Sequence, residues 1–339
     1  MRTPSRVSVR SLAVELGLST ATVSRALSRH PNVDPATRER VQAAAARAGF
    51  KPAQVKNRPK HIALLISLEQ PRVEHYTAEI LSGAMEYCGQ MNLDLSVICL
   101  EPRRITPDEL LRTMLSRHCD GVITALVYEP AALVRLRDAG IPVVVVSDDP
   151  GLPGVGALVC ENASGMRRLT EYLLGLGHRR IALFCLQMQS SAHGERLKTF
   201  KRTLKAAGCY DERLVYPVAP SPDTVLSGVA MAEAFVRDGH PATAVICMND
   251  EVAYGAMRVL RNAKISIPRA ISVAGFDDYP MSLYVEPTLT TVRQPLRDMG
   301  RKGAETLFAA IQSGVADTAG TVFPADLIVR ASTGRPAKA

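Results

Sequence analysis

The chain has 339 residues, of which 47% are hydrophobic and 22% are charged, and its net charge is +8. This composition is typical of a soluble globular protein that is long enough for two or three domains. No apolar run approaches the length of a membrane span, and the first residues lead into no apolar signal core, so we expect a cytoplasmic protein. The seven cysteines are scattered without a Cys-x-x-Cys pair, which argues against disulfides and a zinc site.

The positive charge is concentrated near the N-terminus. Residues 1–60 contain 12 Lys and Arg residues against Glu15, Asp34 and Glu39, a net charge of +9, whereas the remainder has 29 basic and 30 acidic residues. A basic excess confined to one segment is the electrostatic footprint of phosphate binding, because neutralised phosphates release counterions. A solvated basic tail is the alternative interpretation, but such tails do not usually carry a periodic apolar face.

The basic segment begins with the pattern of two short helices. Ser8 suits the cap of a helix over residues 9–16, Gly17 suits a tight turn, and Ser19 suits the cap of a second helix. Apolar residues fall on one face of each helix and can pack together: Leu12, Ala13 and Leu16 from the first helix and Val23, Ala26 and Leu27 from the second. The spacing predicts a helix-turn-helix.

The opposite face of the second helix is short and polar, and it consists of Thr20, Ala21, Thr22, Ser24 and Arg25. Small side chains let the helix backbone approach base edges in the major groove of DNA, and an arginine can read a guanine there. The other interpretation is a solvated helix in a small bundle, because a motif this short is weakly specific.

A third helix is predicted from Asp34 and Pro35, a cap and a first-turn proline, to about residue 48, before Gly49. The residues that can complete a three-helix core are Val41, Ala44 and Ala45. The residues near its N-terminus that suit a phosphate are Asn32, Thr37 and Arg38. Residues 51–60 then form a basic linker with prolines near both ends.

From His61 onward, apolar strand-like runs alternate with amphipathic helical ones. Continuous apolar strands between helices are typical of a parallel sheet that is covered on both faces. Two such series, over about residues 62–147 and 157–276, predict two doubly wound subdomains. The tail holds one more helix, over residues 295–311, and one strand, over residues 325–329.

Polar residues follow the strand ends, and ligands of such sheets bind outside the carboxyl ends of the strands. In the first series they are Ser67, Glu69, His75, Tyr76, Ser147, Asp148 and Asp149, and in the second Glu161, Asn162, Arg196, Asn249, Asp250, Asp277 and Asp278. For any single residue a role as helix cap or loop residue is more common. Several together favour a cleft that binds a polar ligand such as a sugar.

Several motifs resemble those of the lactose-repressor family of bacterial transcription regulators, in the same order along nearly the whole chain. Residues 8–27 and 31–41 resemble the DNA-binding headpiece of that family. Four further stretches resemble the effector-domain motifs of that family: residues 176–181 (Leu-Gly-His-Arg-Arg-Ile), 275–278 (Gly-Phe-Asp-Asp), 289–295 (Leu-Thr-Thr-Val-Arg-Gln-Pro) and 329–333 (Val-Arg-Ala-Ser-Thr). The resemblance implies an all-α helix-turn-helix headpiece and an α/β effector domain with a periplasmic-binding-protein fold. It also implies a repressor that binds operator DNA as a homodimer and a small ligand in its cleft.

The resemblance implies a division into a headpiece (1–50), a linker (51–60) and an effector domain (61–333). Its N-subdomain would take about residues 61–150 and 292–320, and its C-subdomain about 155–289 and 322–333. The base-reading positions are matched by Thr20, Ala21 and Arg25, and the phosphate-contacting ones by Ser19, Thr22, Ser24, Asn32 and Thr37. The family's commonest ligand contacts are matched by Arg196, Asn249 and Asp277, and weaker ones by Ser67, Tyr76 and Glu161.

The linker departs from the family's pattern, which usually has a proline and then a short hinge helix with an Ala-Arg-x-Leu signature. Pro52 is present, but Pro59 stands at the position of the leucine, and the linker is several residues shorter. Proline lacks an N–H and disfavours helical geometry at Arg58 before it. We therefore expect an extended linker in which Lys56, Arg58 and Lys60 follow the phosphates.

Two other classes of protein fit parts of the sequence. A transporter's solute-binding protein would explain the effector domain but not the basic headpiece. An enzyme on a doubly wound fold is disfavoured because the glycine-rich residues 151–156 precede a strand-like run instead of joining strand to helix. We expect no catalytic residue, cofactor or metal. A sugar or sugar derivative is the favoured ligand, with a nucleobase or a sugar acid left open.

Overall fold

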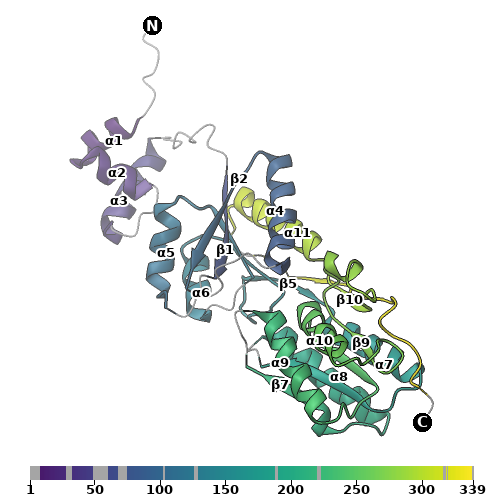
Figure 1. Cartoon of the computed structure of the whole chain (residues 1–339). Helices are drawn as coiled ribbons and strands as arrows, with labels where there is room; N and C mark the ends of the chain where they lie inside the picture. The colour runs from purple at the N-terminus through teal and green to yellow at the C-terminus, as the bar shows by residue number, and fades with distance from the viewer. Residues whose placement is uncertain are drawn as a thin grey trace. The chain divides into compact units, whose positions relative to one another are not determined.

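The computed structural model (Figure 1) describes residues 8–27, 33–48, 60–67, 75–101, 104–125, 129–187, 190–219, 223–315, 318 and 320–337. The chain divides into two compact units, residues 1–58 and residues 59–339.

The first unit contains three helices, α1 (Val9–Leu16), α2 (Thr20–Leu27) and α3 (Pro35–Arg47). Ser8 caps α1 by accepting a hydrogen bond from the Ser11 N–H (3.1 Å), and Gly17 ends it with a φ of 64°, a left-handed conformation that glycine adopts without strain. One core joins the three helices, formed by Leu12, Ala13, Val23, Ala26, Val33, Val41, Ala44 and Ala45. The predicted helix-turn-helix and its three-helix core are therefore confirmed.

The second unit begins with a six-stranded parallel sheet in the order β11-β5-β4-β3-β1-β2. Its strands are β1 (His61–Ser67), β2 (Asp94–Leu100), β3 (Gly121–Thr124), β4 (Val143–Val146), β5 (Gly156–Cys160) and β11 (Thr321–Phe323). Helices α4 (His75–Met91) and α11 (Leu296–Ser313) pack on one face, and α5 (Pro107–Ser116) and α6 (Pro130–Asp138) on the other. We call this sheet with its helices the first subdomain.

The second subdomain is built on a four-stranded parallel sheet in the order β7-β6-β8-β9. Its strands are β6 (Ile181–Leu186), β7 (Val215–Val218), β8 (Ala244–Cys247) and β9 (Ser272–Ala274). Helices α7 (Asn162–Gly175) and α8 (Ser191–Ala206) cover one face, and α9 (Thr224–Arg237) and α10 (Asp250–Asn262) the other. Two short 3-10 helices, η1 (Glu212–Leu214) and η2 (Pro280–Leu283), complete it. Every residue of β6, β8 and β9 is buried, which explains their continuous apolar sequences.

The two subdomains are connected where β5 leads into α7, β10 into α11, and β11 into β12. Strands β10 (Thr291–Arg293) and β12 (Asp326–Ile328) form an antiparallel pair beside the second sheet. The buried Asp278 carboxylate binds at the ends of both strands: it accepts hydrogen bonds from Nε of Arg293, the last residue of β10 (2.7 Å), and from Nη2 of Arg330, which follows β12 (2.5 Å).

The predicted two doubly wound subdomains are present, but the predicted boundaries between them need correction. Residues 155–160 were assigned to the C-subdomain, whereas β5 pairs with β4 and β11 in the first sheet. Likewise β11, which was not predicted as a strand, belongs to the first sheet. Residues 292 and 293 were assigned to the N-subdomain, whereas Thr291–Arg293 pairs with β12 next to the second sheet. An apolar run predicts a strand but does not identify its partner, because pairing depends on where the chain returns.

Glycines allow two pairs of helices to pack with their backbones in contact. A Cβ on Gly300 of α11 would lie 2.0 Å from the Ile80 carbonyl oxygen of α4, and one on Gly228 of α9 would lie 2.2 Å from the Val252 carbonyl oxygen of α10. Figure 1 shows α4 beside α11 and α9 beside α10. Since these are backbone atoms, a side chain at either glycine can be accommodated only if the helices separate.

We expect Gly300→Ala to lower the free energy of unfolding by about 1–3 kcal/mol, the usual cost of overpacking a core. The matched control is Gly303→Ala on the same helix, where the nearest atom, Leu158 Cδ1, would lie at an ordinary 3.5 Å. There the higher helix propensity of alanine should leave stability equal or raise it by up to about 1 kcal/mol. Urea denaturation measures both; equal midpoints for the two variants would contradict the close helix contact.

Candidate functional site

The exposed face of α2 is the candidate surface for DNA. Ser19 caps the helix, since its Oγ accepts a hydrogen bond from the Thr22 N–H at 3.0 Å. Val23 and Ala26 are buried, while the predicted base-reading residues Thr20, Ala21 and Arg25 are exposed, as are Ser19 and Ser24. Thr22 is half-buried, with its Oγ1 2.8 Å from Ser19 Oγ. Because Val23 and Ala26 pack in the core of the three helices, the opposite, predicted face of α2 is left exposed to solvent.

The N-terminus of α3 is capped by Asp34, as the sequence predicted. Asp34 Oδ2 accepts hydrogen bonds from the Thr37 N–H (3.0 Å) and from Thr37 Oγ1 (3.2 Å). The carboxylate of this chain thus occupies the end of the helix where we expected a phosphate, and Thr37 can reach a phosphate only by exchanging this partner. Asn32, and the linker residues 51–59 with Pro59, lie outside the described residues, so their roles stay predictions.

The second site is built around the buried guanidinium of Arg196 on α8. Its Nε donates to Asn162 Oδ1 and its Nη1 donates to the Met248 carbonyl oxygen, both at 2.8 Å. The guanidinium carbon also lies 3.7 Å from the centre of the Phe276 ring. Burial lowers the pKa of Arg196, whereas the nearby Asp277 carboxylate raises it. The side chain, 3% exposed, is held by residues that follow two strands, β8 and β9, and by the start of α7.

Asp277 follows β9 and faces Arg196, with Oδ1 3.8 Å from Nη1. The Gln294 Nε2 donates to the same oxygen at 2.5 Å. Burial raises the pKa of Asp277, and the charge of Arg196 opposes this rise. The backbone of Asp277 has a φ of 127°, which is uncommon for a residue with a side chain. The structure therefore brings together the two predicted ligand contacts as a buried pair.

Tyr76, which belongs to the first subdomain, lies close to Arg196 and Asp277. It lies at the start of α4 and is half-buried. Burial raises its pKa, and Asp277, Arg196 and Asp148 are all close enough to act on it. The Tyr76 hydroxyl lies beside Ser147 at the end of β4. Ser67 ends β1, where its backbone aligns with Leu100; the position of its side chain is outside the described structure.

The other two predicted ligand contacts differ from each other. Asn249 caps α10, where its Oδ1 accepts a hydrogen bond from the Val252 N–H at 2.9 Å. The cap uses the side-chain oxygen, so the amide nitrogen remains as the donor of this side chain. Glu161, in contrast, is exposed and pairs with Arg168 at 3.3 Å, outside the buried cluster. Its neighbour Asn162 is the residue that contacts Arg196, because the first turn of α7 directs it inward.

Three further polar atoms are buried here without a hydrogen-bond partner among the described residues: Ser147 Oγ, His193 Nε2 and Gln294 Oε1. We call the cluster formed by Tyr76, Ser147, Asn162, His193, Arg196, Asp277 and Gln294 the polar junction. His193 and Gln294 were not predicted. His193 precedes Arg196 by three residues on α8, a spacing that places both on one helix face and that could have identified it.

A direct contact joins the two subdomains beside the polar junction. Asp148, which follows β4, accepts hydrogen bonds from the N–H of Ser191 (3.1 Å) and from its hydroxyl, through the same oxygen Oδ1. Ser191 is the first residue of α8, so the carboxylate lies at the positive end of a helix dipole. This contact fixes the first sheet to the helix that carries Arg196 and His193.

A neighbouring buried carboxylate, Asp250, serves the fold. It accepts hydrogen bonds from the Tyr279 N–H (3.0 Å) and the hydroxyls of Ser282 (2.7 Å) and Thr291 (2.6 Å). A Cβ on Gly275 would lie 2.1 Å from Asp250 Oδ1, so only glycine leaves room for this carboxylate. Asp250 therefore orders the loop after β9 that carries Asp277.

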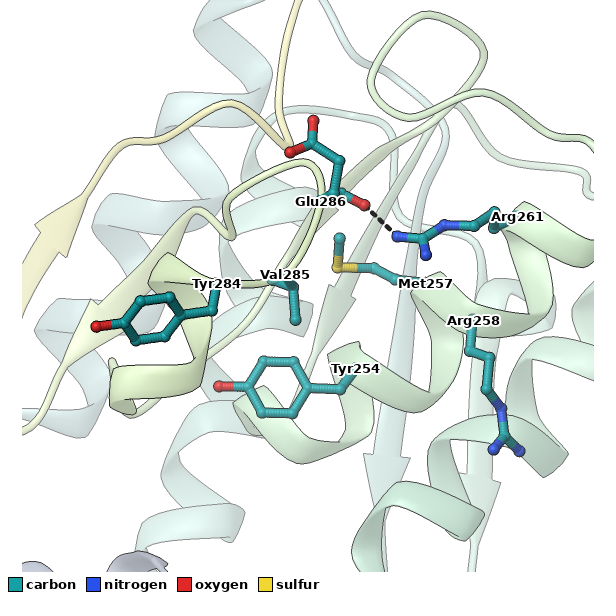
Figure 2. A pocket seen from close by; sticks show the side chains of 7 residues that line it. All are labelled: Tyr254, Met257, Arg258, Arg261, Tyr284, Val285 and Glu286. Carbon is teal, nitrogen blue, oxygen red and sulfur yellow. Dashed lines mark hydrogen bonds between the residues drawn. The ribbon is translucent and has the colours of Figure 1, made fainter.

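A surface groove of about 320 Å³ lies elsewhere, along the outer side of α10 (Figure 2). Its lining residues are Tyr254, Met257, Arg258, Arg261, Tyr284, Val285 and Glu286, none of which belongs to the polar junction. Within this lining, Arg261 Nη2 donates a hydrogen bond to the Glu286 carbonyl oxygen at 2.5 Å. Within the described ranges, no three His, Cys, Asp or Glu side chains gather closely enough to hold a metal ion. None of the described helices is long and apolar enough to cross a membrane.

A helix-turn-helix unit on the same chain as a two-sheet binding-protein fold defines the class of DNA-binding transcription regulators. Residues 10–53 match the model for bacterial regulatory proteins of the lacI family, and residues 170–333 match that for a periplasmic binding protein-like domain. The chain is 31% identical over 336 residues to the HTH-type transcriptional regulator MalR of Streptomyces coelicolor, which covers 95% of both proteins. It belongs to the lacI family of bacterial transcription regulators and is not an enzyme, as the sequence predicted.

Solved structures agree with this assignment. A complex of the transcriptional regulator CelR with cellobiose is 30% identical, has a TM-score of 0.72, and matches over 96% of this chain and 100% of that chain. A lac repressor dimer bound to operator and the anti-inducer ONPF has a TM-score of 0.71 over 97% of this chain and 99% of that chain. At 24% identity, the second structure supports the fold alone.

The contrast between Asn162 and Glu161 gives a test of the polar junction. We expect Asn162→Ala to lower the free energy of unfolding by about 1–3 kcal/mol, because Arg196 Nε would lose its buried acceptor. Glu161→Ala removes only an exposed ion pair and should cost less than about 1 kcal/mol. Thermal and urea denaturation of the two variants measure the difference. A larger loss in Glu161→Ala would contradict the inward placement of Asn162.

Proposed function

We propose that this regulator is a repressor that binds its operator as a dimer and responds to a sugar or sugar derivative held at the polar junction. The observation that carries the proposal is the convergence of Tyr76 from the first subdomain with Arg196 and Asp277 from the second. A ligand bound there contacts both subdomains, so its binding free energy can change their relative position. This is the requirement for coupling a ligand to a distant DNA site.

The DNA-binding half of the proposal rests on α2. Its exposed face has small side chains and one long cation, so the helix can enter the major groove closely with Arg25 directed at a base. Asn32 and Thr37 remain our candidates for phosphate contacts. A regulator of bacterial genes meets its operator in the cytoplasm, where we place this protein.

The ligand-binding half rests on polar groups around a buried arginine. Arg196, Asn249 and Asp277 offer the donors and acceptors that recognise hydroxyl groups, and Tyr76 offers a ring. Ser67 remains a candidate at the end of β1, whereas the ion pair of Glu161 with Arg168 makes it the weakest. The relative CelR was solved with cellobiose, and this supports a sugar as the effector here.

The dimer follows from the size of the DNA-binding surface. One recognition helix reads too few base pairs for tight binding, so two copies on a near-palindrome are needed. Met281, Leu283 and Tyr284 are 47%, 54% and 78% exposed on one short segment, an apolar surface that a second copy would cover. The related lac repressor was solved as a dimer on its operator. Light scattering at micromolar concentration checks this state; a monomer or a stable tetramer would contradict it.

Replacing Arg25 tests the DNA-binding half. Arg25→Ala should weaken operator binding by about 1–3 kcal/mol, the discrimination that a bidentate arginine–guanine contact provides, while non-specific binding changes little. Arg47→Ala, which removes the same charge from the end of α3, serves as the control and should preserve the ratio of specific to non-specific affinity. Gel-shift titrations on operator and random DNA measure this ratio. If it is unchanged in Arg25→Ala, then Arg25 does not read a base.

Replacing Asn249 tests the ligand-binding half. Asn249→Ser keeps a good helix cap but removes the amide nitrogen, so stability should change by less than about 0.5 kcal/mol. Effector affinity should fall about tenfold, because a polar group of the ligand loses its partner. Asp223→Ser, the same kind of replacement at the cap of α9, is the control and should bind effector normally. Calorimetry measures the effector affinity of both variants, and operator binding, which should stay intact, is the second readout. Equal effector affinity in both variants would contradict the assignment of Asn249.

A further inference from the structure

The polar junction contains buried acceptors that the protein itself leaves without donors. Gln294 directs its Nε2 to Asp277, since a carboxylate only accepts hydrogen bonds, and its Oε1 therefore points away. That oxygen is buried and has no partner among the described residues, and the same is true of His193 Nε2. A buried polar atom without a partner destabilises the fold, so these atoms indicate where a ligand supplies the missing groups.

His193 presents an acceptor because of its surroundings. Its Nδ1 lies 3.4 Å from Ser190 Oγ, and its Nε2 is buried on the helix face that also carries Arg196. Burial and the positive charge of Arg196 together lower the pKa of His193 to about 3, so the ring is neutral at physiological pH. The Ser190 hydroxyl oxygen can accept the proton of Nδ1, and in that tautomer the lone pair of the neutral ring is on Nε2.

The one cation of the polar junction, Arg196, already has a carboxylate opposite it. Arg196 faces Asp277 at 3.8 Å, and two of its donors are bonded to Asn162 and Met248. Asp148 is bonded to the first residue of α8. The remaining members of the junction, including Tyr76, are neutral. A carboxylate or phosphate on the ligand would therefore enter a buried site without an opposite charge to pair with, next to acceptors that repel it.

We infer that the effector is a neutral polyhydroxylated molecule, and that His193 is a specificity-determining residue whose Nε2 accepts a hydrogen bond from one of its hydroxyls. Gln294 Oε1 accepts from another hydroxyl, and Ser147 adds a group that can donate or accept. The inference rests on the proposed effector site and narrows its ligand: of the sugar derivatives, those with an acidic group are excluded.

The test uses the full-length protein and calorimetry with matched pairs of ligands: glucose with glucuronate and glucose 6-phosphate, ribose with ribose 5-phosphate, and cellobiose with cellobionate. We expect at least one neutral sugar to bind and its acidic counterparts to bind at least about tenfold more weakly. Equal or tighter binding of an acidic counterpart, or binding of none of the neutral sugars, would overturn the inference. Operator binding without ligand is measured in parallel, and its absence would count against the proposed function instead.

Two variants test His193 itself. His193→Phe removes the acceptor and should weaken binding of the neutral sugar about tenfold, whereas His193→Gln retains an acceptor and should lose less. Deoxy derivatives of that sugar then identify the hydroxyl: one of them should bind wild type and His193→Phe with equal affinity, because the contact is already absent. A structural role for His193 would lower the melting temperature and affect every derivative alike. That result, or unchanged affinity in His193→Phe, would overturn the assignment.

Discussion

The polar edge of the second subdomain depends on the hydrogen bonds and the ion pair that hold the buried charge of Arg196. A guanidinium removed from water costs several kcal/mol unless it is paired and hydrogen-bonded. Its partners come from separate segments: Asn162 begins α7, the Met248 carbonyl follows β8, and Phe276 and Asp277 follow β9. Displacing any one of these segments alone would leave a charged group without its partner. The two strand ends and two helix starts are therefore held together by this one side chain.

The Gly-Phe-Asp-Asp sequence at residues 275–278 shows how closely structure and binding share one segment. Gly275 leaves room for the buried Asp250, Phe276 stacks against Arg196, and Asp277 pairs with the same arginine. Asp278 binds the two arginines beside β10 and β12. The four residues of this motif thus have different roles: Gly275 leaves space, Phe276 and Asp277 hold Arg196, and Asp278 binds two other arginines. The backbone bears part of the cost, with positive φ values at both aspartates.

Features set within a few residues could be predicted from the sequence. A cap, a turn glycine and an apolar face define α1 and α2, and continuous apolar runs define parallel strands. Long-range pairing could not be predicted, because β5 meets β11 only when the chain returns. The sequence also did not show which way neighbouring side chains point. The strand-end pattern located Glu161 and Asn162, but the first turn of α7 decides that Asn162 is the one that faces inward. Gln294 was not predicted as a site residue because its place at the site depends on a hydrogen bond to Asp277, which is not its neighbour in the sequence.

The two arginines on Asp278 also determine where the effector domain can bend. By binding Arg293 and Arg330, this carboxylate fixes the ends of β10 and β12 to the loop after β9, so both strands move with the second subdomain. Flexion must then fall on the three short connections, which are the step from β5 to α7 and the stretches that follow β10 and precede β12; the last two contain Pro295 and Pro324. A proline ring fixes its own φ, so few torsions remain free there. Three short connections, two of them with a proline, thus restrict how far the subdomains can rotate relative to one another.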